Sequence, residues 1–440
     1  MSGTFWKPSE EQRRTILLLE ALGLLHDLGK LSDPFLESQQ PSATTSYEHT
    51  LLADPRLIKT YTSCSAIVGD KASDYAREIQ TSAVGMPSAF SERSDLTWIL
   101  SQVIFKDWAG EEYSFAELAP LVSRSGLARA TADWLAVFGK QMQPGLLIGA
   151  LHGAAHIEKE GEPAENKQPY SHVFRATPFG FEEQIETTSV KELSSTLNAL
   201  PLSSIDNITT TERVKWLGEM RPLLSGGLAD NRRPHNEVSL WDWGYTVASM
   251  AKAASAWIYK NKWPSDVSSL TYRTLRINLD ILERYTHSDK ISDMLGVRRS
   301  LNEAFPRVQA LLEESCAYGN CFYRDETGFY FLLPDILDEN ELAALRLELQ
   351  AQFPLDLIPR VNLGERVTIG ELDSLSPLHD PSAMRRLVAG PRTKALSEAS
   401  AQSDNNLYLF EAEWGAGRPP NSETCTVCGV RPVGYPVRDG

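Results

Sequence analysis

The residues best suited to chemistry lie near the N-terminus, where the sequence LLHDLGKL places His26, Asp27, Gly29 and Lys30 together. An adjacent imidazole and carboxylate can bind one divalent metal ion from two directions, and Gly29 lets the backbone turn closely. A metal held by this dyad would polarise a phosphate and activate water, while Lys30 can reach a phosphate oxygen. The alternative is a helix C-terminus with a capping glycine and incidental polar residues. The setting L-L-H-D-L-G-K favours the metal site.

A hydrolytic metal site needs more ligands than a dyad supplies, and the chain has only eight histidines. His49 lies in SYEHTLLADP, and His152 and His156 lie four residues apart in ALHGAAHIEKE. That spacing places both histidines on one helix face, and we expect His49 and His152 to be ligands ahead of His156. Asp242, in SLWDWGYT, is a further candidate ligand. Its alternative role is to cap the helix that follows.

A second candidate metal site lies near the end of the sequence. Cys425 and Cys428 form a C-x-x-C motif, which is half of a zinc knuckle. Either Cys316 and Cys321 complete this site from a distance, or the partner cysteines lie beyond Gly440. We favour the second alternative and expect a longer parent chain. The total of five cysteines is odd, which argues against a disulfide framework.

Length and composition limit the classes of protein to consider. A chain of 440 residues predicts two or three domains, and 42% hydrophobic residues are enough for real cores. The net charge of −15 argues against a protein that coats duplex nucleic acid nonspecifically, although a metal can supply positive charge locally. No apolar run is long enough for a membrane helix and no signal peptide is recognisable, so we expect a soluble cytoplasmic protein.

The elements expected around these residues change in character along the chain. Up to about residue 260 the sequence is mostly helical, with patterns at 11–28, 95–106, 115–122, 127–140, 145–158 and 240–260. Beyond Pro264 we expect a strand at 272–280, a helix at 289–316, two strands meeting at a tight turn near 325–328, and a helix at 338–352. This order is most of a ferredoxin-like unit, for which 366–372 could supply the last strand. Residues 373–405 read as a linker or irregular insertion.

Taken in order, these motifs resemble the large subunit of type III CRISPR–Cas effector complexes. HDLGK matches that family's opening HD motif, and His49 falls where a second family histidine is expected. The later segments that resemble family motifs are ALHGAAHIEKE (150–160), ATPFG (176–180), SLWDWGYTVASMA (239–251), the unit at 270–372 and TCTVCG (424–429). The resemblance covers nearly the whole chain but only the N-terminal half of the family's architecture.

The resemblance implies an α+β fold in three parts. Residues 1–262 would form an HD-type metal-dependent phosphohydrolase domain, 268–375 a ferredoxin-like palm domain, and 376–440 a linker with the first half of a zinc-binding knuckle. Divalent manganese, nickel or cobalt would be held by the ligand set His26, Asp27, His49, His152 and Asp242. Zinc would bind at Cys425 and Cys428 if partner cysteines exist.

The implied function is RNA-guided antiviral defence, with other CRISPR subunits, guide RNA and target RNA as partners and single-stranded DNA as the substrate of the HD site. Synthesis of cyclic oligoadenylate would need the Gly-Gly-Asp-Asp of a second palm domain, which is absent here. The chain departs from the family at His152, where Asp is usual, at Trp243, where His is usual, and at Lys106–Asp107, where a His pair is expected. Two alternatives therefore stay open: a stand-alone HD nucleotide phosphohydrolase, and a non-catalytic scaffold with a degenerate HD domain.

Overall fold

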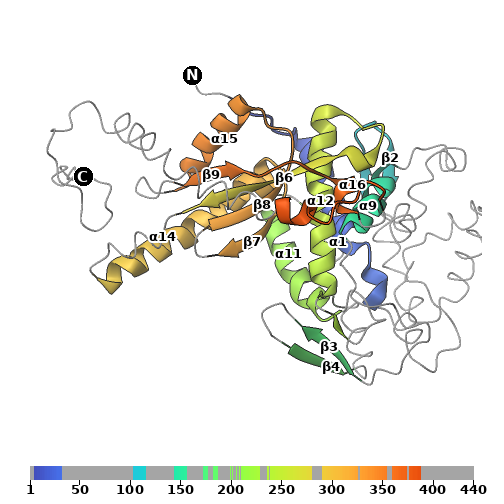
Figure 1. The fold of residues 1–440 in the computed structure, drawn as a ribbon, viewed down its shortest axis with the longest axis horizontal. Helices are drawn as coiled ribbons and strands as arrows, with labels where there is room; N and C mark the ends of the chain where they lie inside the picture. The colour runs from blue at the N-terminus through green and yellow to red at the C-terminus, as the bar shows by residue number, and fades with distance from the viewer. Residues whose placement is uncertain are drawn as a thin grey trace, which may run out of the picture. The chain divides into compact units, whose positions relative to one another are not determined.

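The computed structural model describes about half of the chain as two compact units (Figure 1). The described residues are 4–31, 103–114, 143–155, 172–176, 182–186, 199, 201, 205, 208, 210–227, 235–236, 238–279, 290–325, 328–353, 359–373 and 376–387. The helical unit comprises Ser9–Leu270 and Ile369–His379; the sheet unit comprises Met1–Pro8, Thr271–Thr368 and Asp380–Gly440. Both helices and strands are present, which confirms the mixed class expected from the sequence. None of the described helices is long and apolar enough to cross a membrane.

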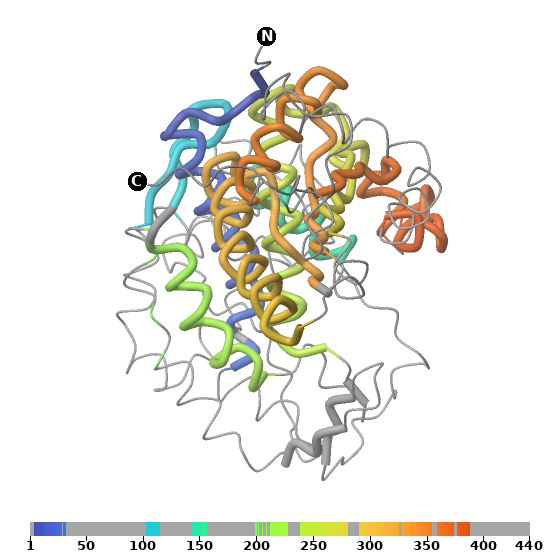
Figure 2. Tube along the Cα trace, turned by 90° about the vertical axis from the view of Figure 1, so that its left-hand side faces the viewer, coloured from blue at the N-terminus to red at the C-terminus, as the bar shows by residue number. Residues whose placement is uncertain are grey.

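Two long helices form the core of the helical unit. Helix α1 (Glu10–Leu25) begins at Ser9, whose Oγ accepts from the Gln12 N–H in a capping box, and it is buried from Thr15 onward. Helix α12 (Leu240–Asn261) begins with a second capping box at Ser239. The two helices lie side by side in both ribbon and tube views (Figures 1 and 2).

Glycines allow α1 and α12 to approach backbone to backbone. A Cβ atom on Gly23 would lie 2.9 Å from the Cα of Ala248, and one on Gly244 would lie 2.7 Å from the carbonyl oxygen of Leu24. Both positions are too close for any side chain, so the pair of helices is fixed where α1 ends. His26 and Asp27 follow directly and are placed by this contact.

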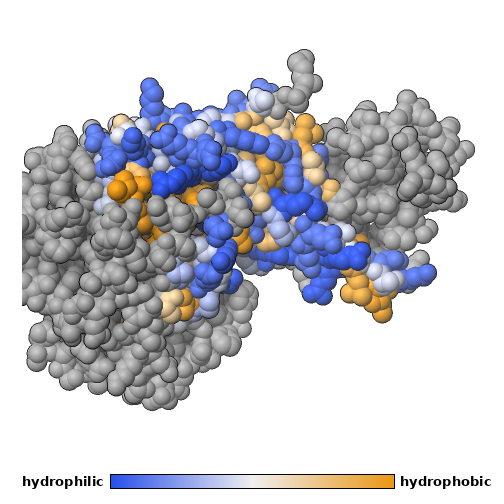
Figure 3. Space-filling view, turned by 180° about the vertical axis from the view of Figure 1, so that it is seen from behind, coloured by the Kyte–Doolittle hydropathy of each residue, from blue (hydrophilic) through white to orange (hydrophobic). Residues whose placement is uncertain are grey.

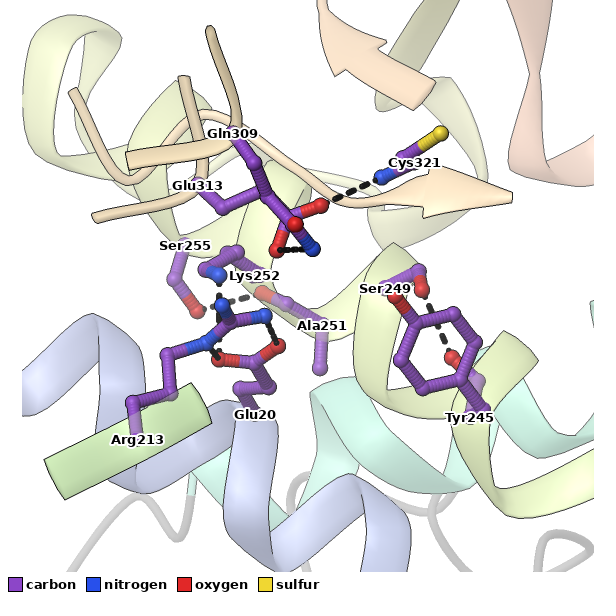
Figure 4. Close-up of polar contacts among 10 residues, drawn as sticks. All are labelled: Glu20, Arg213, Tyr245, Ser249, Ala251, Lys252, Ser255, Gln309, Glu313 and Cys321. Carbon is purple, nitrogen blue, oxygen red and sulfur yellow. Dashed lines mark hydrogen bonds and ion pairs between the residues drawn. The ribbon is translucent and has the colours of Figure 1, made fainter. Parts of the chain in front are cut away.

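A buried ion cluster ties α1 and α12 to helix α11 (Thr210–Ser225) (Figure 4). Arg213 donates to both carboxylate oxygens of Glu20, at 2.6 and 2.7 Å. The ammonium of Lys252 lies 3.0 Å from the same carboxylate, and all three side chains are buried. Two cations around one carboxylate compensate the desolvation that each charge would suffer alone.

The remaining described elements of the helical unit are short. They are the 3-10 turns η1 (Leu28–Leu31) and η4 (Val267–Ser269), helices α9 (Gln143–Ala154) and α16 (Ile369–Leu372), the hairpin β1 (Ile104–Lys106) and β2 (Glu112–Ser114), and the sheet β4-β3-β5 formed by Glu182–Glu186, His172–Ala176 and His235–Asn236.

The helix expected at 95–106 is wrong at its described end, where residues 104–106 are the strand β1. The cause is the turn that follows. Asp107 Oδ1 accepts hydrogen bonds from the N–H groups of Ala109 and Glu111, and Gly110 adopts a φ of 84°. This turn folds the chain back into an antiparallel hairpin.

The sheet unit contains strands and helices in the order β-α-β-β-α-β. They are β6 (Thr271–Asn278), α14 (Ile291–Gln309) with a π-helical turn (Ala310–Ser315), β7 (Cys321–Asp325), β8 (Gly328–Pro334), α15 (Glu339–Gln350) and β9 (Arg360–Leu363), with the short β10 (Val367–Thr368). Strand β6 pairs with β8 on one edge and with β9 and β10 on the other, and β7 pairs with β8. Every one of these pairs is antiparallel.

The first half of α14 differs from the second. Leu301, Ala304 and Val308 are buried, whereas residues 291–300 include no buried residue. Ile291 and Leu295 are 76% and 59% exposed, and hydrophobic residues gather at this end of the helix in the space-filling view (Figure 3). The long amphipathic helix expected over 289–316 is therefore anchored by its C-terminal half.

The last strand expected at 366–372 is corrected in two ways. Strand β9 precedes that segment, and only Val367–Thr368 continue as strand β10. Thr368 still pairs with Thr271, but the N–H of Ile369 already donates to the carbonyl of Leu270 in the helical unit. Residues 369–379 thus return to the helical unit, where a Cβ atom on Gly370 would lie 3.3 Å from the Cβ of Ser268.

Candidate metal centre

Three potential ligands from two helices meet in the helical unit. His26 is the C-cap of α1, Asp27 follows it, and His152 lies in the last turn of α9. One ligand atom from each side chain lies within 4.8 Å of the other two. The side chains of His26 and Asp27 are almost completely buried. The structure therefore brings together three of the residues singled out in the sequence.

The hydrogen bonds of His26 decide which of its nitrogens faces this group. Its Nδ1 lies 2.6 Å from the carbonyl oxygen of Gly23. Because a carbonyl can only accept, Nδ1 carries a proton, and in the neutral imidazole Nε2 then keeps a lone pair. Nε2 lies 2.8 Å from Nδ1 of His152 and 3.4 Å from Oδ2 of Asp27. Gly23 thus contributes both to the helix packing and to the tautomer of the candidate ligand His26.

The two separations measured from His26 Nε2 fit a transition metal ion. Bonds from such an ion to nitrogen or oxygen are about 2.0–2.2 Å, which places two ligand atoms at right or tetrahedral angles about 2.8–3.6 Å apart. The two distances from His26 Nε2, 2.8 Å and 3.4 Å, fall in this range. Two imidazoles and one carboxylate are also a donor set suited to divalent first-row metals.

Lys30 and Trp243 border the same group. The ammonium of Lys30 lies 2.7 Å from Asp27 Oδ2 and 5.6 Å from the centroid of the Trp243 ring. The His152 ring lies 5.2 Å from that indole, and it meets the His26 ring edge to face at 5.0 Å. One buried indole therefore contacts both a candidate ligand and the neighbouring cation.

The structure does not bring Asp242 into this group. Its side chain is exposed, and its Oδ2 accepts from both the N–H and the hydroxyl of Ser239, at 3.0 and 2.7 Å. These contacts are those of the helix cap that was the alternative reading of this residue. His49, His156, Cys425 and Cys428 lie outside the described residues, so their roles stay predictions.

The thiols of Cys316 and Cys321 lie in the sheet unit and are both protonated at neutral pH in the absence of metal. Burial raises the pKa of each thiol to about 12, whereas a ligand must be the thiolate. Cys321 donates its S–H to the carbonyl of Tyr323, and its own N–H donates to Glu313 (Figure 4). Whether they complete a knuckle with Cys425 and Cys428 stays a prediction, because that pair lies outside the described residues.

Asp107 closes the β1–β2 hairpin and is not one of the three clustered side chains. Burial raises the pKa of its carboxyl group, and the hydrogen bonds from Glu111 and Ala109 oppose that shift. Its Oδ2 is buried without a hydrogen-bond partner. This residue has a structural role in the turn and is a pH-sensitive point of the fold.

One neighbour of the site was missed in the sequence. The carboxylate of Asp373 lies against α9, where a Cβ atom on Gly153 would meet its two oxygens at 3.3 and 3.4 Å. Asp373 is buried and belongs to the segment that returns to the helical unit. The palm domain expected from the sequence, 268–375, includes Asp373, because nothing in its local sequence signals this return to the helical unit.

Neither a family model nor a curated protein matches the chain. Solved structures do. A Csm1–Csm4 cassette in complex with pppApApA shares 13% identity, covers 90% of this chain and 50% of its own, and has a TM-score of 0.46. Csm1 of T. onnurineus shares 14% identity, covers 87% of this chain and 49% of the Csm1 chain, and has a TM-score of 0.42. The Csm1–Csm4 subcomplex of a type III-A CRISPR-Csm interference complex shares 13% identity, with 87% of this chain and 48% of the matched chain covered and a TM-score of 0.43.

The chain is therefore similar, over most of its length, to structures of the type III-A CRISPR large subunit. It spans about half the length of the chains it matches. At this identity and with TM-scores below 0.5, the function has to be inferred from the residues of the site.

Proposed function

We propose that this chain is the N-terminal part of a type III CRISPR effector large subunit, acting in RNA-guided antiviral defence. Its helical unit would be an HD-type domain that cleaves single-stranded DNA with a divalent metal. The observation that carries this proposal is the meeting of His26, Asp27 and His152, two of them separated by 126 residues. All three occupy positions that the resemblance assigns to metal ligands.

The residues divide the chemistry among them. His26 Nε2, His152 Nδ1 and the Asp27 carboxylate would hold manganese, nickel or cobalt, with His49 as a further proposed ligand. The ion would supply Lewis acidity to the phosphate and lower the pKa of water. Lys30 would neutralise charge on a phosphate oxygen, and Trp243 would keep water away from one side of the ligands.

The sheet unit would be the palm domain. Its β-α-β-β-α-β order and antiparallel pairing, with β6 and β8 central, correspond to the ferredoxin-like pattern. We propose that it docks partner subunits and a guide RNA paired with target RNA, and that Cys425 and Cys428 begin a zinc knuckle. The sequence contains no Gly-Gly-Asp-Asp, so synthesis of cyclic oligoadenylate is not part of the proposal.

The test is cleavage of labelled single-stranded DNA with manganese, nickel or cobalt. His26→Ala/Asp27→Ala should abolish cleavage, whereas Asp242→Asn should retain it because that carboxylate is engaged in the helix cap. Equal cleavage by the wild type and the dyad variant would contradict the assignment. Phosphate release from free nucleotides, without cleavage of DNA, would favour a stand-alone HD nucleotide phosphohydrolase.

A non-catalytic scaffold is the second candidate, and one observation favours it. The ammonium of Lys30 lies 2.7 Å from Asp27 Oδ2, and Trp243 stands where the family usually has a histidine. Metal analysis of the purified protein separates the two candidates. A protein that neither retains nor binds a transition metal would support the scaffold.

A further inference from the structure

Lys30 binds the carboxylate oxygen that a metal would share with His26. Its ammonium lies 2.7 Å from Asp27 Oδ2, the atom that is 3.4 Å from His26 Nε2. The Asp27 side chain is 1% exposed and that of Lys30 is 13% exposed. Because little water screens this ion pair, its attraction is stronger than that of a surface pair.

The surrounding residues hold the ammonium in this position. The N–H of Lys30 donates to the carbonyl of Asp27 at 3.0 Å, which closes the turn between them. The ammonium also lies over the face of Trp243, an arrangement that favours a cation. Lys30 is therefore held at the ligand group by a carboxylate and an aromatic face.

We propose that Lys30 is a gate that couples metal binding to phosphate binding at this site. A divalent ion at Asp27 Oδ2 would stand within a few ångströms of the ammonium, and like charges at that distance repel. Metal binding therefore displaces Lys30 from Asp27. A phosphate oxygen of the substrate is the partner that can receive the displaced ammonium.

This exchange of partners by Lys30 makes metal binding and phosphate binding cooperative. With no phosphate present, Lys30 competes with the metal for Asp27 and lowers the metal affinity. With phosphate present, Lys30 turns to the new anion and the competition ends. Because coupling between two sites is reciprocal, bound metal also raises the affinity for phosphate by the same factor. No covalent bond of the chain or of the phosphate is made or broken. The inference rests on the proposed function, since it takes the metal site as given.

The experiment measures cobalt affinity, by visible absorption and calorimetry, with and without a short phosphorothioate oligothymidylate. Lys30→Met keeps an apolar stem to pack on Trp243 but removes the charge. It should bind cobalt about tenfold more tightly without the oligonucleotide, the scale on which residues beside metal ligands act. The oligonucleotide should tighten cobalt binding to the wild type more than to Lys30→Met.

Two further variants control for charge and chemistry. Lys30→Arg keeps a cation and should keep the weak affinity and the coupling. Lys215→Met removes the same charge from an exposed position on α11 and should behave as the wild type. Thermal unfolding of every variant checks that the fold is retained.

The outcomes separate this inference from the proposed function. If the wild type binds cobalt and Lys30→Met binds it equally or more weakly, the gate is overturned and the metal site stands. If cobalt binds only to Lys30→Met, the ammonium blocks the site as proposed. If neither protein binds cobalt, both the metal site and the gate are wrong.

Discussion

Nδ1 of His152 lies 2.8 Å from Nε2 of His26, although 126 residues separate them in the chain. One nitrogen is at the end of α1 and the other is in the last turn of α9, so the candidate centre exists only where these two helix ends meet. Any change that moves α9 should therefore alter metal binding without touching a ligand.

Gly153→Ala tests this dependence. The added Cβ would lie 3.3 Å from a carboxylate oxygen of Asp373, which is tighter than an ordinary contact, so the Asp373 side chain or α9 must move by a few tenths of an ångström. We expect cobalt affinity to fall about tenfold, as for other residues that support metal ligands. Gly218→Ala is the control, because a Cβ there meets nothing within 4 Å. Unchanged affinity in Gly153→Ala would show that this packing does not position His152.

Glu20→Gln tests the buried ion cluster. Removing the carboxylate charge takes from the buried cations Arg213 and Lys252 their attraction to Glu20. We expect the free energy of unfolding in urea to fall by about 3–5 kcal/mol, the range for breaking a buried pair. Glu219→Gln lies at an exposed position on α11, the helix that carries Arg213. It should change the free energy of unfolding by less than about 0.5 kcal/mol. Similar losses in both variants would refute the role of the cluster.

Asp107→Asn tests the pH dependence of the hairpin. Burial raises the pKa of this carboxyl above its ordinary 3.8, so the folded protein binds this proton more tightly than the unfolded chain does. The contribution of Asp107 is then fully present below pH 3.8 and is lost as the pH rises through the raised value. The asparagine can still accept from Ala109 and Glu111 but does not titrate. Its stability relative to the wild type should therefore rise from acidic to neutral pH, and a constant difference in urea unfolding would contradict this.

Alkylation with iodoacetamide tests the state of Cys316. Burial raises the pKa of this thiol to about 12, so at neutral pH it is protonated and poorly nucleophilic. We expect Cys316 to stay unmodified in the folded protein, with or without zinc, and to react once urea is added. Peptide mass mapping distinguishes it from the other cysteines. Rapid modification that zinc prevents would instead place Cys316 in the zinc site.

Long elements with a clear hydrophobic period were predicted from the sequence. Examples are the helix at 240–260, found at Leu240–Asn261, and the strand at 272–280, found at Thr271–Asn278. Short elements were not. The strands at Ile104–Lys106 and Arg360–Leu363 are too brief to show a period, and pairing with neighbouring strands decides that they form.

The sequence by itself determined the dyad. His26 and Asp27 are adjacent, and the helix pattern that ends before them brings imidazole and carboxylate to one helix end whatever else the chain does. Only the tertiary structure decided what joins them. His152 reaches His26 because α9 lies beside α1, whereas Asp242 binds Ser239 of its own helix start. Local spacing cannot distinguish these cases, because the first depends on the packing of α9 beside α1 and the second on a cap within one helix.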